Sequence, residues 1–312
     1  MKVFAGRSNL PLAEEICQEL GISLGALSIK TFSDGEIWVK YEENIRNEEV
    51  FVIQSTNPPA DNIIELMLLL DAARRASARS VTAVIPYYGY ARQDRKDRPR
   101  VPISARLFLD TFETVGASRI ITMDLHSPQI QGFVNIPFDH LYSRLVLLER
   151  LKQEGLDYDN GVVLSPDMGS ARMGQAYARY LDVGFALIDK RRPAPNRVEV
   201  VHLVGNLKDR HVLIIDDMVD TAGTLVSAAA SARDNGALSV TAVATHALVT
   251  GPAVERLKGA SIDHIIATNT IDIQNNELGE KLEIISVAKV FAESMRRITE
   301  GKSLSSLFEV EG

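Results

Sequence analysis

The sequence HVLIIDDMVDTAGTLVSAAASARDNG, at residues 211–236, decides the fold that we predict for this chain. Residues 212–215 form an apolar, β-branched run, which is typical of a strand buried on both faces of a parallel sheet. Asp216 and Asp217 come at the end of this run, and a short loop separates them from Thr224, where Ala and Leu at helical spacing begin. The stretch therefore predicts a strand, an acidic loop and a helix.

The predicted loop has a composition that suits a phosphate group. Ligands of open α/β sheets bind outside the carboxyl ends of the strands, and backbone N–H groups at a helix N-terminus attract anions. The loop residues are Asp220, Thr221, Ala222, Gly223 and Thr224. The acidic pair before them would repel a phosphate but accept hydrogen bonds from sugar hydroxyls, so a polyol phosphate satisfies both ends of the loop. Two solvated carboxylates before an ordinary helix cap are an equally open alternative, because Asp and Thr are also common capping residues.

The composition indicates a globular protein with a large core. Of the 312 residues 46% are hydrophobic, and the formal net charge of -7 argues against a general nucleic-acid surface. For this reason we expect no nucleic-acid partner. No apolar run is long enough to span a bilayer, so we expect no membrane partner either. The single cysteine, Cys17, excludes an intramolecular disulfide, and its helical surroundings predict a packed thiol. The N-terminus lacks a signal-peptide core, which predicts a cytoplasmic protein.

Apolar, β-branched runs alternate with helix-like segments along most of the chain. The predicted strands are residues 49–54, 81–88, 119–123, 162–164, 185–188, 212–215, 240–245, 262–267 and 282–285. The predicted helices are residues 61–77, 103–115, 141–154, 171–180, 224–235 and 252–257. This alternation is typical of βαβ units and predicts an α/β fold with mainly parallel sheets flanked by helices.

Two short repeated sequences suggest an internal duplication. SVTAV and GAS occur in the same order in each half, at residues 80–84, 116–118, 239–243 and 259–261. Chance matches of common residues are the alternative. We predict two related α/β domains, residues 1–145 and 146–312, with the final residues packing back on the first domain.

Two segments in the first half carry residues suited to a nucleotide. TFSDGE at residues 31–36 has the composition of a tight turn, and its alternative role is a base contact through Phe32 with Asp34 or Glu36. The segment at residues 87–104 follows a strand and gathers the cations Arg92, Arg95, Lys96, Arg98 and Arg100. Such a charge run is often a solvated loop, but its place at the carboxyl end of a strand favours polyphosphate binding.

Acidic residues and a histidine follow two further predicted strands. Asp124 and His126 come after residues 119–123, a pattern able to hold a cation, although a lone His is more often structural. Asp167 similarly precedes a small-residue loop and a helix. The remaining histidines have no ligand spacing, and we expect them to be structural.

A basic segment, DKRRPAPNR at residues 189–197, follows another strand. It is either a surface hairpin or a mobile loop that closes over a bound nucleotide, excludes water and directs Lys190 and Arg192 at the transferred group. The chain contains no GxxxxGK[ST] motif, so a nucleotide must be held without a Walker loop.

Together these segments resemble the ribose-phosphate diphosphokinases, or phosphoribosyl pyrophosphate synthetases, nearly from end to end. The motifs that carry the resemblance are FSDGE, YARQDRKDR-x-R-x-PISA, TMDLH-x-x-QIQGF, SPD-x-G, ALIDKRR, IIDDMVDTAGT, TNTI and SLSSLF. The chain is most similar to the phosphate-regulated class I branch. This resemblance implies two phosphoribosyltransferase-like domains per subunit, a homohexamer, Mg²⁺ as cofactor, and phosphate and ADP as effectors.

The resemblance also implies a role for each matching residue. Those assigned to ATP are Phe32, Asp34, Gly35, Glu36, Arg92 and Gln93, the first four contacting adenine from a neighbouring subunit. Those assigned to Mg²⁺ are His126 and Asp167, and those assigned to catalysis are Lys190 and Arg192. Those assigned to ribose 5-phosphate are Arg192, Asp216, Asp217, Asp220, Thr221, Ala222, Gly223 and Thr224.

The implied reaction transfers the β,γ-diphosphoryl group of Mg-ATP to the 1-hydroxyl of ribose 5-phosphate. Two alternatives are a type I phosphoribosyltransferase, which uses the same loop to consume the product, and a non-catalytic regulatory homologue. The chain departs from the family pattern at Pro128 and at Gly169-Ser170, where some relatives have Ser and a Gly-Gly pair. The first departure borders the family's effector site, to which Ser104, Arg106, Gln131 and residues 303–306 would belong.

Overall fold

The computed structural model describes residues 1–153, 160–191 and 200–307, apart from the side chains of residues 190, 191, 200 and 201. Packing divides the chain into two compact units. Unit 1 comprises Met1–Ser143, Thr270–Asp272 and Ser286–Gly312, and unit 2 comprises Arg144–Asn269 and Ile273–Ile285. Unit 1 thus includes the last helix of the chain, whereas the predicted domain boundary at residue 145 stays a prediction.

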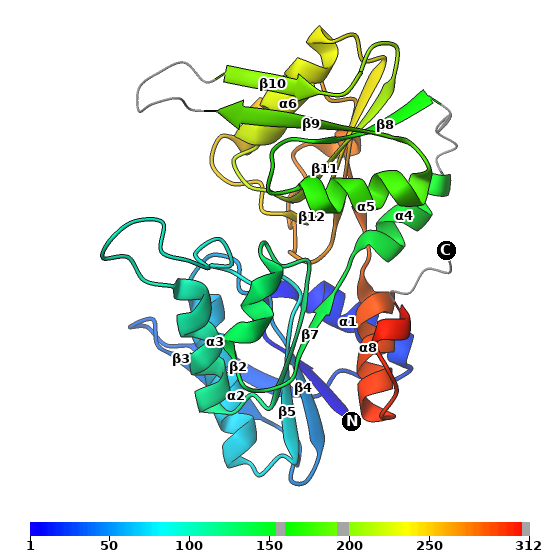
Figure 1. Cartoon of the computed structure of the whole chain (residues 1–312). Helices are drawn as coiled ribbons and strands as arrows, with labels where there is room; N and C mark the ends of the chain where they lie inside the picture. The colour runs from blue at the N-terminus through cyan, green and yellow to red at the C-terminus, as the bar shows by residue number, and fades with distance from the viewer. Residues whose placement is uncertain (154–159, 192–199, 308–312) are drawn as a thin grey trace. The chain divides into compact units, whose positions relative to one another are not determined.

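Unit 1 is built on a parallel five-stranded sheet with the order β1-β4-β5-β6-β7 (Figure 1). Its strands are β1 (Lys2–Ala5), β4 (Glu49–Ile53), β5 (Ser80–Ile85), β6 (Arg119–Met123) and β7 (Phe138–Leu141). Val50 and Val52 of β4 pack with helices α2 (Asp61–Arg75) and α3 (Ser104–Val115), and the alternate residue Phe51 is also buried. Burial on both faces explains the continuous apolar runs of these strands.

Two helices from opposite ends of the sequence pack together in unit 1. They are α1 (Leu10–Leu20) and α8 (Ala288–Thr299), and Ile16 and Phe291 are among their fully buried residues. Cys17 on α1 is 3% exposed. Burial, together with the nearby Glu14, raises the pKa of its thiol to about 11, so it is the packed thiol that we expected. The short 3-10 helices of the unit are η1 (Arg7–Asn9), η2 (Pro128–Phe133) and η5 (Ser305–Leu307).

An antiparallel hairpin of β2 (Leu27–Thr31) and β3 (Ile37–Tyr41) forms a separate sheet in unit 1. Tyr41 contacts the Phe4 ring edge to face, with ring centres 4.7 Å apart, and its hydroxyl donates to the Leu69 carbonyl of α2 at 3.0 Å. The hairpin is therefore anchored on the unit, and the turn predicted at residues 31–36 is confirmed.

Unit 2 is built on a seven-stranded sheet with the order β10-β9-β8-β11-β12-β13-β14. Only β9 and β10 pair in antiparallel fashion among its described strands. The strands are β8 (Gly161–Ser165), β9 (Gly184–Arg191), β10 (Val200–Val204), β11 (His211–Val219), β12 (Ser239–Ala247), β13 (His264–Thr268) and β14 (Leu282–Ile285). The central strand β11 thus has parallel neighbours on both sides.

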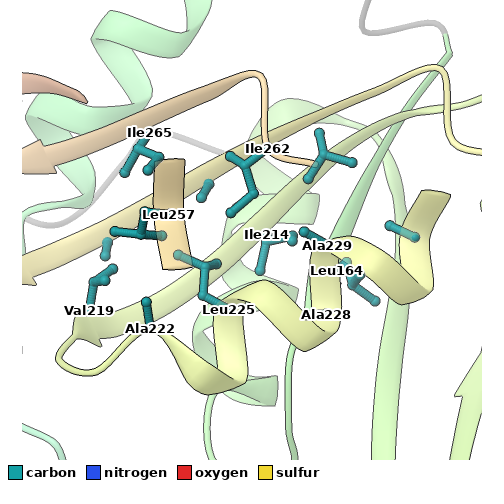
Figure 2. Packing of buried hydrophobic residues seen from close by; sticks show 14 of the residues in the cluster. Leu164, Ile214, Val219, Ala222, Leu225, Ala228, Ala229, Leu257, Ile262 and Ile265 are labelled. Carbon is teal, nitrogen blue, oxygen red and sulfur yellow. The ribbon is translucent and has the colours of Figure 1, made fainter. Parts of the chain in front are cut away.

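Helices cover both faces of the unit 2 sheet. They are α4 (Arg144–Gln153), α5 (Ala171–Leu181), α6 (Gly223–Asp234), α7 (Ala253–Gly259) and the short 3-10 helix η4 (Gly279–Lys281). Ile214 of β11 packs with α6 and α7, while the adjacent Leu213 and Ile215 pack with α4 and α5. Figure 2 shows Ala228 and Ala229 of α6 close to the sheet. Their small side chains allow a close approach of helix and strand.

The predicted fold class is confirmed, and the repeated sequences occupy equivalent places in the two units. SVTAV begins β5 in unit 1 and β12 in unit 2, while GAS precedes their neighbours β6 and β13. Both units are therefore mainly parallel sheets flanked by helices, with matching βαβ segments. Among the described residues, no helix is long and apolar enough to cross a membrane.

Some predicted elements were wrong in extent or missed. The helix predicted at residues 141–154 begins at Arg144, because Leu141 ends β7 and residues 142–143 connect the two elements. The strand predicted at residues 81–88 ends at Ile85, before a proline that cannot continue the ladder. Strands β1 and β7, with the sequences KVFA and FDHL, were missed because neither has a run of β-branched residues, and α8 was also missed.

A buried carboxylate fastens the start of the chain to α2. Glu65 is 2% exposed, and its two oxygens accept from the backbone N–H and the Nε of Arg7, both at 2.6 Å. Gln54 Nε2 donates to the same carboxylate at 3.1 Å. Arg7 also donates to Thr31 Oγ1 at 3.0 Å, at the start of the hairpin turn. One guanidinium therefore compensates a buried charge and holds the hairpin.

We predict that Arg7→Met lowers the free energy of unfolding by about 2–3 kcal/mol, because a hydrogen-bonded buried carboxylate loses its counter-charge. Urea unfolding followed by circular dichroism measures the change. Arg75→Met removes the exposed ion pair with Asp71 on α2 and is the matched control, for which we expect a much smaller shift. Equal shifts in the two variants would contradict the assignment.

Candidate active site

Strand β11 carries its acidic pair beyond the reach of its neighbour β8. Pairing with β8 ends at Ile214, whereas pairing with β12 continues to Val219. Asp216 and Asp217 therefore lie within the strand and not at its end, which corrects the prediction. Ladder bonds to β12 keep this stretch extended, so the two carboxylates are held on regular backbone at the carboxyl edge of the sheet.

The carboxyl of Asp216 lies in a strongly acidic and crowded environment. Burial among protein atoms raises its pKa well above the ordinary value, and the nearby charges of Asp217 and Asp167 raise it further. Its Oδ1 accepts from the Asp217 N–H at 3.0 Å. The crowding favours a protonated carboxyl without ligand, and it prepares the site for a partner that supplies hydroxyl donors or positive charge.

A short loop joins β11 to the N-terminus of α6. The helix begins at Gly223, one residue earlier than predicted, and Ala222 before it adopts a left-handed conformation with φ 63°. Ala222 is buried, whereas Thr221, Gly223 and Thr224 are exposed. The loop thus presents small side chains and the first N–H groups of a helix to solvent, which is a common arrangement for binding an anion.

Asp167 lies on the loop between β8 and α5. Its Oδ1 accepts from the N–H groups of Gly169 at 2.8 Å and Ser170 at 3.1 Å. This fixes the orientation of a partly exposed carboxylate at the same edge of the sheet as Asp216, because β8 and β11 are parallel neighbours. A carboxylate oxygen is a ligand that Mg²⁺ prefers.

Lys190, one of the two residues predicted to be catalytic, lies in β9 of the same sheet. The backbone of Lys190 pairs with Val201 across β9 and β10. The side chain of Lys190 and the whole of Arg192 lie outside the described residues. Their predicted roles stay predictions.

In unit 1, the predicted ATP residues Arg92 and Gln93 follow β5. Both are exposed, and the Oε1 atom of Gln93 accepts from the Ser104 hydroxyl at 2.6 Å. An amide whose oxygen is engaged in this way can use its N–H groups to bind an anion. Gly89 allows the turn, because a Cβ there would lie 2.2 Å from the Thr56 carbonyl oxygen.

Asp124 and His126 follow the adjacent strand β6 but differ in their surroundings. Asp124 is 5% exposed, has φ 36°, and accepts from the Ser143 N–H at 3.0 Å, so it shapes the turn. His126 is exposed. His140 of β7 accepts from the Leu125 N–H through Nε2 at 2.9 Å. His140 is therefore structural, as expected. It supports the turn that carries His126, and no spacing in the sequence indicates this support.

The predicted adenine residues occupy the tip of the hairpin. The Phe32 N–H donates to the Glu36 carbonyl at 2.8 Å, and the Asp34 carboxylate accepts from the Glu36 N–H at 3.0 Å. Gly35 has φ 93°, which favours glycine. Phe32 is 51% exposed. An ordered turn thus presents an aromatic ring to solvent, where it can stack on a base.

A pocket of about 390 Å³ lies elsewhere in unit 1. It is lined by residues 138–142 of β7 and its end together with Leu304 and Ser305. Gln131 lies beside the lining residue His140, with Nε2 3.4 Å from Nδ1. Gln131 and Ser305 were both among the residues that the resemblance implied for an effector site.

Each unit brings its own predicted residues together. In unit 2, the loop of Asp167 and the phosphate loop follow the neighbouring strands β8 and β11. In unit 1, Arg92 and His126 follow the neighbouring strands β5 and β6. Among the described residues, no group of three or more His, Cys, Asp and Glu side chains could hold a metal ion. This is compatible with Mg²⁺, which usually takes one or two protein ligands plus substrate oxygens.

Comparisons with known proteins cover the chain almost completely. The profile described as the N-terminal domain of ribose phosphate pyrophosphokinase matches residues 1–116, and that of the phosphoribosyl synthetase-associated domain matches residues 190–309. Ribose-phosphate pyrophosphokinases from Chlorobaculum tepidum and Aquifex aeolicus are each 47% identical to this chain over 99% of its length. The matched region covers 95% of the first protein and 99% of the second. The crystal structure of phosphoribosylpyrophosphate synthetase from Mycobacterium smegmatis matches with TM-score 0.91 and 37% identity, over 96% of this chain and 99% of that chain.

We predict that Asp216→Asn stabilises the ligand-free protein more at pH 8 than at pH 4. The folded state keeps the Asp216 proton where the unfolded chain has lost it. This contribution to stability is present at acid pH and is lost as the pH rises from about 4, the ordinary pKa of Asp, through the raised pKa of the folded state. Asparagine does not titrate, so the variant lacks this pH dependence. The parent and Asp216→Asn should therefore converge in stability near pH 4, where the Asp216 carboxyl becomes protonated in the unfolded chain as well.

Urea unfolding between pH 4 and 8 measures this difference. Asp234→Asn, at the exposed end of α6, is the matched control. The same pH profile in both variants, or a stability gain for Asp216→Asn that grows towards acid pH, would show that the carboxyl of Asp216 does not hold a raised pKa.

Proposed function

Because the chain belongs to the ribose-phosphate pyrophosphokinase family, we propose that it transfers the β,γ-diphosphoryl group of ATP to the 1-hydroxyl of ribose 5-phosphate. The products are 5-phosphoribosyl 1-diphosphate, a precursor for nucleotide biosynthesis, and AMP. The observation that carries the proposal is the edge of β11, where two carboxylates and an anion-binding loop meet on a chain that matches this family end to end.

The edge of β11 has the chemistry needed for ribose 5-phosphate. The N–H groups and hydroxyls of the phosphate loop (residues 220–224) would bind the 5-phosphate at the positive end of α6. Asp216 and Asp217 would accept hydrogen bonds from the 2- and 3-hydroxyls. Hydrogen bonds from these hydroxyls would offset the repulsion between the two carboxylates, so a ligand would stabilise an arrangement that is unfavourable without it.

Unit 1 would hold ATP. Arg92 and Gln93 offer exposed N–H donors for the phosphates, and Phe32 offers an exposed ring for adenine. Asp34, Gly35 and Glu36 complete the base contact at the tip of the hairpin. These hairpin residues would reach the adenine from a neighbouring subunit of a homohexamer, an assembly that rests on the family resemblance.

We also propose that His126 in unit 1 and Asp167 in unit 2 each ligate or position Mg²⁺. The orientation of the Asp167 carboxylate by two backbone N–H groups fits this role. When bound, Mg²⁺ neutralises charge on the phosphate oxygens. His140, through the Leu125 N–H, would keep the His126 turn in place.

The chemical step needs positioning and charge neutralisation more than covalent catalysis. The anomeric hydroxyl would attack the β-phosphorus in line, the bond to the α-phosphate oxygen would break, and AMP would leave. Lys190 and Arg192 would stabilise negative charge on the transferred group, and Arg92 would hold the phosphates. No phosphorylated protein intermediate is required.

Regulation and assembly extend the proposal. Phosphate and ADP are the effectors implied for class I members. Of the residues implied for their site, Leu304 and Ser305 line the pocket beside β7, and Gln131 lies beside its lining residue His140. The cytoplasmic location stays a prediction. The comparisons favour neither a phosphoribosyltransferase nor a non-catalytic homologue, because the full-length relatives are pyrophosphokinases.

Incubation with Mg-ATP and ribose 5-phosphate, followed by ³¹P NMR, tests the proposed function. We expect AMP and a new diphosphate on C1. Formation of ADP would instead mean transfer of the γ-phosphoryl group. Absence of turnover in the presence of phosphate and Mg²⁺ would contradict catalysis and favour the regulatory homologue.

We predict that Lys190→Ala lowers the turnover number by about 10²-fold or more without altering the fold, because single electrostatic contacts to a transition state typically contribute that much. Coupled assay of AMP release measures the rate, and circular dichroism checks the fold. Lys208→Ala, in an exposed loop before β11, is the control. A rate for Lys190→Ala within a few-fold of the parent would refute its catalytic role.

A further inference from the structure

The phosphate loop is attached on one side to the segment that follows β12. This supporting segment comprises residues 248–256, includes the start of α7, and belongs to unit 2 together with the loop. Leu248 and Val249 both donate their N–H groups to the Val219 carbonyl, at 2.9 and 3.0 Å. Thr250 donates its N–H to the Asp220 carbonyl at 3.0 Å.

A side chain from α7 completes this set of contacts. Arg256 donates from a guanidinium nitrogen to the Thr221 carbonyl at 3.0 Å. Three consecutive carbonyls at the start of the loop are therefore held by one supporting segment. In a trans peptide the carbonyl and the following N–H point in opposite directions. Anchoring these carbonyls on one side thus directs the following N–H groups to the other side, where they can converge on an anion.

The supporting segment also controls the carboxylate within the loop. Asp220 would repel a phosphate if its side chain approached the ligand. The Thr250 hydroxyl donates to Asp220 Oδ1, which restricts the rotation of this carboxylate. Asp220 can then contribute to phosphate binding through its backbone while its charge is kept in a fixed place.

Arg256 contributes charge as well as an anchor. Its guanidinium nitrogen lies 3.6 Å from the position that a Cβ on Gly223 would occupy, at the first residue of α6. The cation therefore lies next to the loop and adds to the positive potential of the helix N-terminus.

The backbone of the supporting segment is itself unusual. Val249 has φ 46°, a left-handed conformation that β-branched residues rarely adopt. This conformation accompanies the donation of two consecutive N–H groups to the Val219 carbonyl, at the end of β11 directly before the loop. A strained residue persists only where the surrounding contacts hold it, and here they include the Val219 carbonyl before the phosphate loop and the core of unit 2.

From these contacts we infer that Thr250 and Arg256 are positioning residues for the 5-phosphate of ribose 5-phosphate. Thr250 fixes the Asp220 carboxylate and the loop carbonyl, and Arg256 fixes the Thr221 carbonyl and supplies positive charge. The inference rests on the proposed function, since it concerns the substrate that this loop would bind. It predicts selective loss of ribose 5-phosphate affinity when either residue is changed, with ATP affinity retained.

Isothermal titration of ribose 5-phosphate into the full-length protein with Mg²⁺, combined with steady-state kinetics, tests this inference. Thr250→Val keeps the shape and removes the hydroxyl, and we expect about tenfold weaker binding and a similar rise in KM for ribose 5-phosphate. The kcat and the KM for ATP should change less than twofold. Thr250→Ser restores the hydroxyl and should return affinity to within about twofold of the parent.

Arg256→Met keeps the apolar stem and removes the charge, and we expect about fivefold weaker binding together with a flatter dependence of affinity on salt concentration. Arg256→Gln retains a donor without the charge and should recover only part of the affinity. Lys258→Met removes a neighbouring exposed cation from α7 and is the matched control, with parental affinity expected.

Different experimental results would refute the inference and the proposed function. Parental affinity in both Thr250→Val and Arg256→Met, or equal losses for ribose 5-phosphate and ATP, would overturn the inference while the parent still forms AMP. A loss in Lys258→Met as large as in Arg256→Met would overturn the role of Arg256. If Thr250→Val does not fold, the exposed Arg256 variants still decide the outcome. A parent that neither binds ribose 5-phosphate nor forms AMP would refute the proposed function itself.

Discussion

Parallel pairing of β8, β11 and β12 is the constraint on which the candidate site depends. Because the faces of these strands are covered by helices, polar side chains are concentrated at the strand ends. Parallel strands bring those ends to one edge of the sheet, so residues far apart in sequence, such as Asp167 and Asp216, affect one another. Unit 1 repeats the arrangement with β5 and β6, which carry Arg92 and His126 to one edge.

This concentration of polar groups has an energetic cost. Asp216 has a raised pKa because burial and two neighbouring acids oppose its charge, so the ligand-free edge of β11 is not arranged for maximum stability. Hydroxyl groups of a ligand could donate to the carboxylates and reduce their repulsion. The N–H groups of the phosphate loop could instead bind an anion. In the proposed function the carboxylates and the phosphate loop belong to one site, and their opposite electrostatic requirements are separated along a single strand and helix.

Long-range contacts hold the backbone of the predicted residues within each unit, the phosphate loop in unit 2 and the His126 turn in unit 1. The loop carbonyls are held by the segment after β12, and the turn bearing His126 is held by His140 from β7. These supporting residues form hydrogen bonds to backbone groups of the predicted site and need no contact with a ligand. Sequence motifs identify residues that recur next to ligands, whereas supports of this kind come from other strands and helices and carry no local spacing.

The sequence by itself determined the alternation of strands and helices, the two related sheets, and the places where acidic and basic residues follow strands. These features follow from local periodicity and chain order, which a sequence displays directly. Only the tertiary structure decided that β11 continues through Asp217 to Val219, that Asp124 is buried while His126 is exposed, and that Thr250 and Arg256 support the phosphate loop. Each of these depends on pairing or hydrogen bonding between segments distant in the chain, because strand ends, burial and loop anchors are set by neighbours that local sequence does not specify.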